Sequence, residues 1–310
     1  MGPCWNTRKR TDLGSVYFFG AAPGVSPAGF GIYVCPVCKG RLTRSADRLL
    51  CLMCRVTYPI AEGIPDFILE DLGQSTSPVL RSVKWIDRLA GIYETKLWYP
   101  IILNLYGGLG SPSLGELVLI VTGMVGPVKG LVLDAACGPG TLGRRVAPRS
   151  TVYGVDISKG MLRKGLAFVE RDHLSNVHFA RAKVEELPFP DDLFDAAVCG
   201  GALHLFADTK LALREIGRTM KEGAPLAVTT FVAGNKGILR FRRVRIHVQQ
   251  HHSVHVFELP QLESYLTESG FEDFLPQVYG SLLVFSARKR GVHGLEAHER
   301  PRSEGLPWTC

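Results

Sequence analysis

The sequence has no uninterrupted run of the ~18–20 apolar residues that a membrane-spanning helix needs. The longest candidate, from Leu117 to Val128, is broken by Gly123, Gly126 and Pro127. We therefore expect no transmembrane segment. The sequence also has no internal repeat, so a repeat architecture is not expected.

A strong charge bias is also absent. The 36 Lys and Arg residues exceed the 29 Asp and Glu residues only moderately, which gives a formal net charge of +7 and a pI near 9.0. This balance permits an anionic partner, such as RNA or a membrane surface, but does not demand one. It is more typical of a mildly basic soluble enzyme.

The two ends of the chain have little pattern of a folded domain. Arg8, Lys9 and Arg10 precede a short apolar run, Val16 to Ala22, which resembles a signal peptide only weakly. We expect residues 1–30 to be a disordered leader. The C-terminal residues 291–310 are rich in Gly, Pro and charge, and we expect a disordered tail there.

A disulfide framework is absent too, although the chain has eight cysteines. Four of them form two Cys-x-x-Cys pairs, and the rest are scattered. The pairs are Cys35 with Cys38 and Cys51 with Cys54. This spacing is typical of a metal site, so we expect a reducing, cytoplasmic environment. Two tight turns joined by a hairpin can bring four thiolates to one tetrahedral zinc ion.

A four-thiolate zinc site has no open coordination position, so its role would be structural rather than catalytic. A module as small as residues 31–70 has too little hydrophobic core to fold alone, and a bound metal supplies the missing folding free energy. The alternative is two chance pairs of free or redox-active thiols. The segment TYPIAEGIPDF, after the second pair, resembles the small zinc ribbon that occurs beside some methyltransferases or activates them as a separate protein. The resemblance runs from Tyr33 to Phe67 and implies that the ribbon binds zinc and packs on a catalytic domain.

Between the two ends, the chain divides into three regions. Residues 31–70 form the expected zinc ribbon, residues 75–125 a helical lid and linker, and residues 126–290 the main domain. In the main domain short apolar runs alternate with amphipathic segments, which predicts a mostly parallel sheet with helices on both faces. The runs lie at 130–134, 151–156, 177–180, 194–199, 226–231 and 282–287.

The stretch LVLDAACGPGTLG contains Gly138, Gly140 and Gly143 in the spacing of a dinucleotide-binding loop. Asp134, however, ends the preceding strand, where its carboxylate would repel a pyrophosphate. An acid there suits S-adenosylmethionine, which combines an α-ammonium and a sulfonium with a neutral adenosine. Gly138 and Gly140 would let the backbone approach such a ligand, and Gly143 would allow close packing of helix and strand.

Asp156 ends the next strand, in TVYGVDIS, and an acid there can accept both ribose hydroxyls. Because dinucleotide sites share this feature, Asp156 does not discriminate between the two ligands, whereas Asp134 does.

From Gly130 to Arg288 the chain resembles the class I S-adenosylmethionine-dependent methyltransferases. The resemblance rests on the glycine loop, on AKVEELPFPDDLFDAAVCGGALHLF, on ALREIGRTMKEGAPLAVTTF and on the closing SLLVFSARK. It implies a Rossmann-like, seven-stranded α/β fold whose last strand is antiparallel. The subgroup that it resembles most acts in ubiquinone and menaquinone biosynthesis. The implied cofactor-binding residues are Asp134, Cys137, Gly138, Gly140, Asp156, Ile157, Ala182, Lys183, Val184 and Gly200.

Lys183 departs from the family pattern, which usually has an acid here to accept the adenine amino group. A charged lysine cannot accept a hydrogen bond. Glu185 could substitute, with the backbone of Ala182 and Val184 bracketing the ring. Otherwise the cofactor site is weakened, and the protein is a non-catalytic methyltransferase-fold partner of another protein.

His204, in CGGALHLF, is the candidate base, since the family places residues that face the transferred methyl after the fourth strand. The alternative is a histidine that only packs or caps a helix. Aromatic residues at helical spacing can form an apolar lid or simply core: Tyr93, Trp98, Tyr99 and Tyr106.

A basic insertion, residues 236–255, precedes the last helix of the main domain. Basic and apolar residues alternate from Arg243 to Val248, so one face is basic if the segment is extended, and the pattern is less clean for a helix. Such a face could recognise a phosphate backbone or a lipid surface, or could simply be solvated. The histidine spacing matches no metal site.

The sequence therefore favours a methyltransferase for a small, apolar, phenolic or quinone-like acceptor, with S-adenosylmethionine and structural zinc. The first alternative is an RNA methyltransferase, which the net charge fits. It is disfavoured because Gly200-Gly201-Ala202 stands where base-methylating enzymes often have an Asn-Pro-Pro-Tyr tetrapeptide. The second alternative is the non-catalytic partner protein. Peripheral membrane contact remains open.

Overall fold

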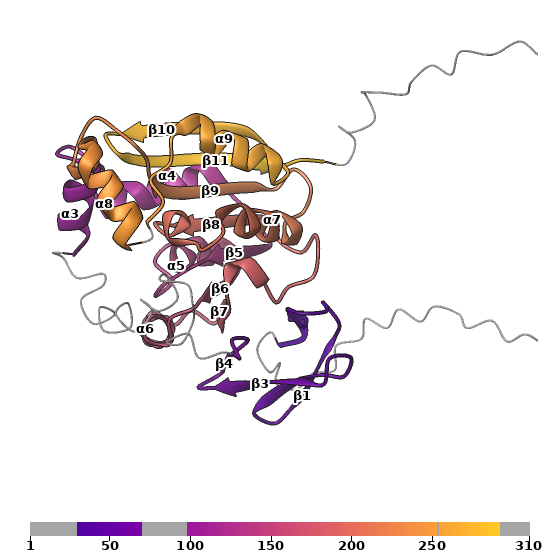
Figure 1. The fold of residues 1–310 in the computed structure, drawn as a ribbon. Coiled ribbons are helices and arrows are strands. Elements are labelled where there is room, and N and C mark those ends of the chain that lie inside the picture. Colours follow the sequence, from indigo (N-terminus) through magenta and orange to yellow (C-terminus); the bar gives the residue numbers. More distant parts are fainter. Residues whose placement is uncertain (1–29, 70–97, 253, 292–310) are drawn as a thin grey trace, which may run out of the picture.

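The computed structural model describes residues 30–69, 98–252 and 254–291. It contains a seven-stranded sheet flanked by helices and a small four-stranded sheet near the N-terminus (Figure 1). The predicted leader, the tail and most of the linker, residues 70–97, lie outside the described residues.

The large sheet has the strand order β10-β11-β9-β8-β5-β6-β7. Its strands are β5 (Leu131–Ala135), β6 (Thr151–Asp156), β7 (Val177–Arg181), β8 (Ala196–Gly200), β9 (Pro225–Phe231), β10 (Phe271–Tyr279) and β11 (Leu282–Lys289). The strands from β5 to β9 pair in parallel, whereas β11 is antiparallel to both of its neighbours. The predicted mostly parallel seven-stranded sheet with an antiparallel last strand is confirmed.

Helices cover both faces of this sheet, because its strands are apolar on both sides. In β5, Val132 contributes to one hydrophobic cluster while Leu133 and Ala135 contribute to the cluster on the opposite face. Helices α7 (Thr209–Thr219) and α9 (Leu259–Glu268) pack in the cluster that contains Leu133. Helices α4 (Leu114–Val125) and α6 (Lys159–Arg171) pack in the cluster that contains Val132. The strand ends that form the site are thereby held between two packed layers.

Side-chain caps fix where three of these helices begin. Ser113 and Glu116 form a reciprocal capping box at α4. Ser158 accepts the backbone N–H of Met161 at the start of α6, and Asp208 caps α7. The short α5 (Gly143–Val146) follows the glycine loop directly.

The small sheet contains β1 (Leu42–Ser45), β2 (Arg48–Cys51), β3 (Val56–Ala61) and β4 (Ile64–Pro65) in sequence order, after a 3-10 turn η1 (Phe30–Ile32). It lies beside β7, the edge strand of the large sheet (Figure 1). The backbone N–H of Phe67 donates to the Arg181 carbonyl at 2.8 Å, and Asp66 and Arg181 form a parallel bridge. The ribbon thus covers an edge that would otherwise be open to pairing.

Two segments cover the ends of the central strands. The first runs through α3 (Trp98–Ile102) into a π-helical turn, η3 (Leu103–Gly107). The second is the basic insertion, which forms a 3-10 turn, η7 (Ile238–Arg240), and α8 (Arg242–His252). The extended alternative for this insertion is wrong. Val244 and Val248, four residues apart, face the hydrophobic cluster under α8, so burial follows the helical period.

Across the described residues, no helix combines the length and apolar character that crossing a membrane requires.

Candidate active site

The glycine loop between β5 and α5 is built around a buried carboxylate. Asp134 is 1% exposed, and its Oδ2 accepts the backbone N–H of Gly143 at 2.9 Å. A Cβ on Gly143 would lie 2.8 Å from that oxygen and 2.9 Å from Val152, so only glycine fits here, as the sequence predicted. Gly138 and Gly140 have positive φ values, which glycine adopts without strain.

Burial dominates the electrostatics of Asp134. It raises the pKa of this carboxyl to about 7, helped by the neighbouring Asp156 charge and opposed by the Gly143 hydrogen bond. The Gly143 hydrogen bond and the Arg144 charge therefore offset only part of the cost of ionising Asp134. A cation delivered beside it would gain a strong interaction.

Asp156, at the end of β6, holds the same loop from the neighbouring strand. One of its oxygens accepts the N–H of Gly138 and the other that of Ser158, both at 2.8 Å. A carboxylate can accept about four hydrogen bonds, so a carboxylate at this position suits ligand hydroxyl groups as well as loop N–H groups.

The turn after β7 brings further predicted residues to the same place. Ala182, Val184 and Glu185 line the cavity; Ala182 directly follows β7, and the other two lie in η5 (Val184–Glu186). Lys183 is half-buried at the start of η5 and is not among the described residues that line the cavity. One oxygen of Glu185 accepts the backbone N–H of Ala207 at 3.1 Å.

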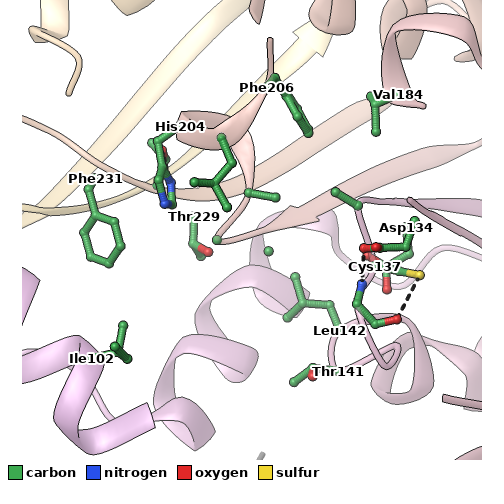
Figure 2. Close-up of a pocket in the computed structure, with 18 of the residues that line it drawn as sticks. Ile102, Asp134, Cys137, Thr141, Leu142, Val184, His204, Phe206, Thr229 and Phe231 are labelled. Atoms are coloured by element: carbon green, nitrogen blue, oxygen red, sulfur yellow. Dashed lines mark hydrogen bonds between the residues drawn. The ribbon is translucent and has the colours of Figure 1, made fainter. Parts of the chain in front are cut away.

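These groups meet in one cavity of about 390 Å³ (Figure 2). Asp134 and Cys137 lie at one end, and His204, Thr229 and Phe231 lie at the other, with Leu142 between them. The predicted residues that line it are Asp134, Cys137, Gly138, Asp156, Ile157, Ala182, Val184, Gly200, His204, Tyr99 and Tyr106. Gly140 shapes the loop from behind, where a Cβ would press on Phe179. Tyr93 lies outside the described residues, and the side chain of Trp98 is not described.

The ends of the cavity differ in chemistry. Its charged lining residues, among those that the structure describes, are Asp134, Asp156 and Glu185, with no lysine or arginine. The opposite end is apolar, and helical residues from α3, η3, η7 and α4 enclose it. Those residues include Ile102, Leu103, Tyr106, Leu114, Leu117 and Leu239. The arrangement suits a cationic ligand at the loop and an uncharged apolar molecule beyond it.

His204 is the titratable group of the apolar end. It lies in η6 (Leu203–Leu205), is 6% exposed and faces the cavity (Figure 2). Its Nδ1 lies 3.3 Å from the Thr230 hydroxyl, and its ring packs edge-on to Phe231. Burial, together with the nearby His255, lowers the pKa of His204 to about 4. The imidazole is therefore neutral at physiological pH.

Sequence reasoning missed one group of lining residues. Thr229, Thr230 and Phe231 end β9, next to the strand that carries Gly200. The signal was available, because ligands of open α/β sheets bind at the carboxyl ends of the strands. Leu239, from the basic insertion, also lines the cavity and carried no signal in the sequence.

The four ribbon cysteines converge as the spacing predicted. The Sγ atoms of Cys35, Cys38, Cys51 and Cys54 all lie within 4.8 Å of one another. Tetrahedral zinc with Zn–S bonds near 2.3 Å requires sulfur–sulfur distances of about 3.8 Å, so the cluster fits such an ion. The Tyr58 hydroxyl lies 3.2 Å from the Cys35 sulfur and can support it as a thiolate. In the rest of the described chain, no comparable cluster of metal ligands occurs.

Comparison with known proteins agrees with this geometry. Residues 132–223 match the family described as a methyltransferase domain. An uncharacterised chloroplastic methyltransferase of Arabidopsis thaliana is 31% identical over 170 residues, which cover 52% of this chain and 47% of that protein. The demethylmenaquinone methyltransferase of Listeria welshimeri is 36% identical over 100 residues, or 31% of this chain and 42% of that protein. The chain thus spans less than half the length of these curated relatives.

The fold is similar to that of a phosphoethanolamine N-methyltransferase from Haemonchus contortus, solved with phosphomonomethylethanolamine and S-adenosylhomocysteine. The TM-score is 0.56 at 19% identity, and the alignment covers 70% of this chain and 61% of that one. The family match falls on β5 to β8, the strands that carry the glycine loop, Asp156 and Gly200, and ends before β9. Residues 132–223 therefore match a methyltransferase domain, and the fold around them is similar to that of an S-adenosylmethionine-dependent methyltransferase.

Proposed function

We propose that the protein transfers a methyl group from S-adenosylmethionine to a small, uncharged, apolar acceptor of phenolic or quinone-like chemistry. The observation that carries this proposal is the composition of the cavity, with carboxylates at the glycine loop, no described lysine or arginine, and an apolar opposite end. A pyrophosphate would meet three acids there and no compensating cation. An ammonium and a sulfonium would be attracted.

Different residues would bind the different groups of S-adenosylmethionine. Asp134 would pair with the ammonium, Asp156 would accept the ribose hydroxyls, and Ala182 and Val184 would bracket the adenine. Glu185 would accept the adenine amino group in place of the acid that Lys183 replaces, because Glu185 lines the cavity and Lys183 does not. When bound, S-adenosylmethionine supplies an activated methyl group on its sulfonium.

At the apolar end, Tyr106, Phe231 and the α3 side chains would position the acceptor and exclude water. His204 would receive a hydrogen bond from an acceptor hydroxyl through Nε2, because Thr230 already pairs with Nδ1. With a pKa of about 4, His204 orients the acceptor rather than storing its proton at neutral pH. A phenol would release that proton to solvent.

We also propose that the four cysteines hold a structural zinc ion. Their convergence supports it, as does the position of the ribbon against β7, where none of its described residues lines the cavity. Zinc would stabilise the fold of the ribbon and take no part in methyl transfer.

The test is a methyl-transfer assay with isotopically labelled S-adenosylmethionine and a panel of lipid-soluble phenols and hydroquinones. Each compound is paired with an analogue of similar size that carries a carboxylate. We expect transfer to the neutral member and at least about tenfold less to the anionic one, because a buried charge would find no cation. A preference for the anionic analogues, or for RNA, would contradict the proposed acceptor while leaving cofactor binding intact.

A further inference from the structure

The helical segment that walls the cavity is apolar on both of its sides. Tyr99, Ile102, Leu103 and Tyr106 of α3 and η3 line the cavity. The outward side also has large apolar side chains, since Ile101 is 59%, Leu105 43% and Leu109 84% exposed. Asn104 is the amide-bearing residue of this segment, and its side chain bonds back to the Pro100 carbonyl. A helix that is apolar all round is normally covered by something other than water.

The basic insertion packs directly against this segment. The turns η3 and η7 are in contact, and a Cβ on Gly108 would collide with Lys236 and with the backbone of Gly237. Leu109 therefore emerges beside the start of the insertion. Figure 1 shows α3 and α8 on one side of the molecule, away from the ribbon, and η7 contacts both η3 and α8.

The insertion adds exposed cations and apolar residues to the same face. Arg240, Arg242 and Arg243 are exposed, Phe241 is 50% and Ile246 37% exposed, and the Arg240 guanidinium lies 4.4 Å from the centre of the Phe241 ring. The residues from Trp98 to Gly110 and from Asn235 to His252 include five Lys or Arg residues and no Asp or Glu. Those five cations are Lys236, Arg240, Arg242, Arg243 and Arg245.

We propose that this face, the outer side of α3–η3 together with η7 and α8, docks on the surface of a bilayer that contains anionic lipid. Arginines beside exposed leucine, isoleucine and phenylalanine are the composition of an interfacial helix, in which cations meet headgroups and apolar side chains enter the acyl boundary. An RNA surface would use the arginines but would leave the Ile101, Leu105 and Leu109 stripe in water.

The location of the face adds a functional reason. Its inner side lines the apolar end of the cavity, so among the described residues the α3–η3 wall lies between that end and a lipid-dissolved acceptor. The inference therefore rests on the proposed apolar acceptor for its purpose. Membrane binding itself is tested without any methyl transfer, so the two proposals can fail separately.

The experiment is co-sedimentation of the full-length, zinc-loaded protein with sucrose-loaded vesicles. One set contains phosphatidylcholine alone and the other about one third phosphatidylglycerol. The double variant Arg242→Glu/Arg243→Glu tests the charges, and Leu109→Ser tests the apolar stripe. Acidic side chains at the N-terminus of α8 interact favourably with the helix dipole, so the double variant should keep its fold. The matched controls are Lys129→Glu/Arg149→Glu, which reverses two exposed charges at the opposite ends of the strands, and Leu211→Ser on α7.

We expect the wild-type protein to sediment with the anionic vesicles. Arg242→Glu/Arg243→Glu should lower the partition coefficient by about tenfold or more, and Leu109→Ser should lower it with both vesicle types, while both controls bind as wild type. Wild-type protein that stays in the supernatant would overturn the proposal, as would equal losses in the controls. Two other results would overturn the proposal by assigning the face to a different partner. Light scattering that shows a dimer, broken by Leu109→Ser, would assign it to a second copy of the chain. Binding to duplex RNA that is lost only in the arginine variant would assign it to RNA.

Discussion

At the scale of single residues, Asp134 decides what the glycine loop can bind. The G-x-G-x-x-G spacing alone fits a dinucleotide as well as S-adenosylmethionine. Asp134 is buried under the loop, and this burial raises its pKa to about 7, although the Gly143 hydrogen bond and the Arg144 charge act in the opposite direction. Nothing cationic among the described lining residues offsets it. The unliganded site therefore holds a carboxyl whose ionised form is stabilised mainly by a cationic ligand.

The pH dependence of cofactor binding should report this carboxyl. Below its pKa of about 7 a proton must leave before the carboxylate can pair with the ammonium, so affinity should fall by up to about tenfold per pH unit. Above pH ~8 the α-amino group of the ligand itself loses its charge. Calorimetric titration from acid to alkaline pH should give a bell-shaped affinity profile. Asp134→Asn should weaken binding and remove the acid limb, whereas Asp273→Asn, an exposed control, should retain it.

Asp134 should also affect the stability of the fold. Its ionised form, which favours ligand binding, destabilises the folded protein. Its pKa is raised from 3.8 to about 7 in the folded protein, so the folded state holds a proton that the unfolded state releases. Folding free energy is lost as the pH rises through that window. Unliganded Asp134→Asn should therefore unfold at a higher temperature than wild type at pH ~8. A lower unfolding temperature would show that Asp134 is a structural acid.

His204 should act as a neutral group. Because its pKa is about 4, the pH–rate profile should show no limb near 6.5 from this residue. His204→Phe should reduce kcat/KM by about ten- to a hundredfold through loss of the acceptor hydrogen bond. His173→Asn, a change at an exposed turn, serves as the control. A limb near pH 6.5 that disappears in His204→Phe would mean that this histidine titrates during catalysis.

Residue identities near the cofactor loop were largely predictable, because each follows a strand end that the apolar pattern reveals. Asp134, Asp156 and His204 all lie in the cavity lining. Whether the Lys183 side chain lines the cavity was not predictable, since the direction of one side chain within a short turn depends on packing. Glu185, two residues later, is the one that reaches the cavity.

At the scale of elements, the contact between β4 and β7 joins the ribbon to the cofactor loop. Arg181 donates two hydrogen bonds to Asp66, at 3.0 and 2.9 Å, and a third to the Ile157 carbonyl at 2.9 Å. Both side chains of the Asp66–Arg181 pair are nearly buried. The ribbon thereby fixes the backbone that follows Asp156.

Breaking this pair should cost both stability and cofactor affinity. Asp66→Asn leaves the Arg181 charge without its full partner, which costs on the order of 3 kcal/mol for a buried pair. The position of Ile157 should loosen with it and raise the dissociation constant for S-adenosylmethionine. Glu62→Gln removes an exposed ribbon–α6 ion pair with Arg163, worth at most about 1 kcal/mol, and is the matched control. Equal effects of the two changes in denaturant titrations would refute this role.

The strands of the main sheet other than β10 were predicted to within about two residues, because apolar runs between Gly and Pro breaks determine them; none of the predicted runs corresponds to β10. The insertion was harder. Its alternation from Arg243 to Val248 suits a strand, but the segment forms α8. Val248, which is buried, and Val244, which is half-buried, lie at helical spacing and pack on a neighbouring surface that the local sequence does not reveal.

At the scale of the whole molecule, the ribbon and the main domain share one core. Tyr33 and Phe67 of the ribbon pack with Tyr153 and Phe189 of the main domain. Metal that organises the ribbon would therefore stabilise the whole protein and not just the ribbon. The cytoplasmic location and the disordered termini stay predictions from the sequence.

Removal of the metal tests this coupling. Elemental analysis should find zinc in the purified protein, and a chelator should lower the unfolding temperature in one cooperative step. Cys54→Ser should have the same effect, while Cys4→Ser, outside the described residues, should retain the metal. A protein that contains no zinc, or that unfolds identically after chelation, would contradict the structural role.

The central claim is that the cavity binds S-adenosylmethionine, and calorimetric titration of the full-length, zinc-loaded protein tests it most directly. NADH, which carries a pyrophosphate, is the control ligand. We predict binding of S-adenosylmethionine in the micromolar range and none of NADH, because the lining acids attract the first and repel the second. Binding of NADH, or of neither ligand, would contradict the account, and the second result would identify Lys183 as the mark of a lost cofactor site.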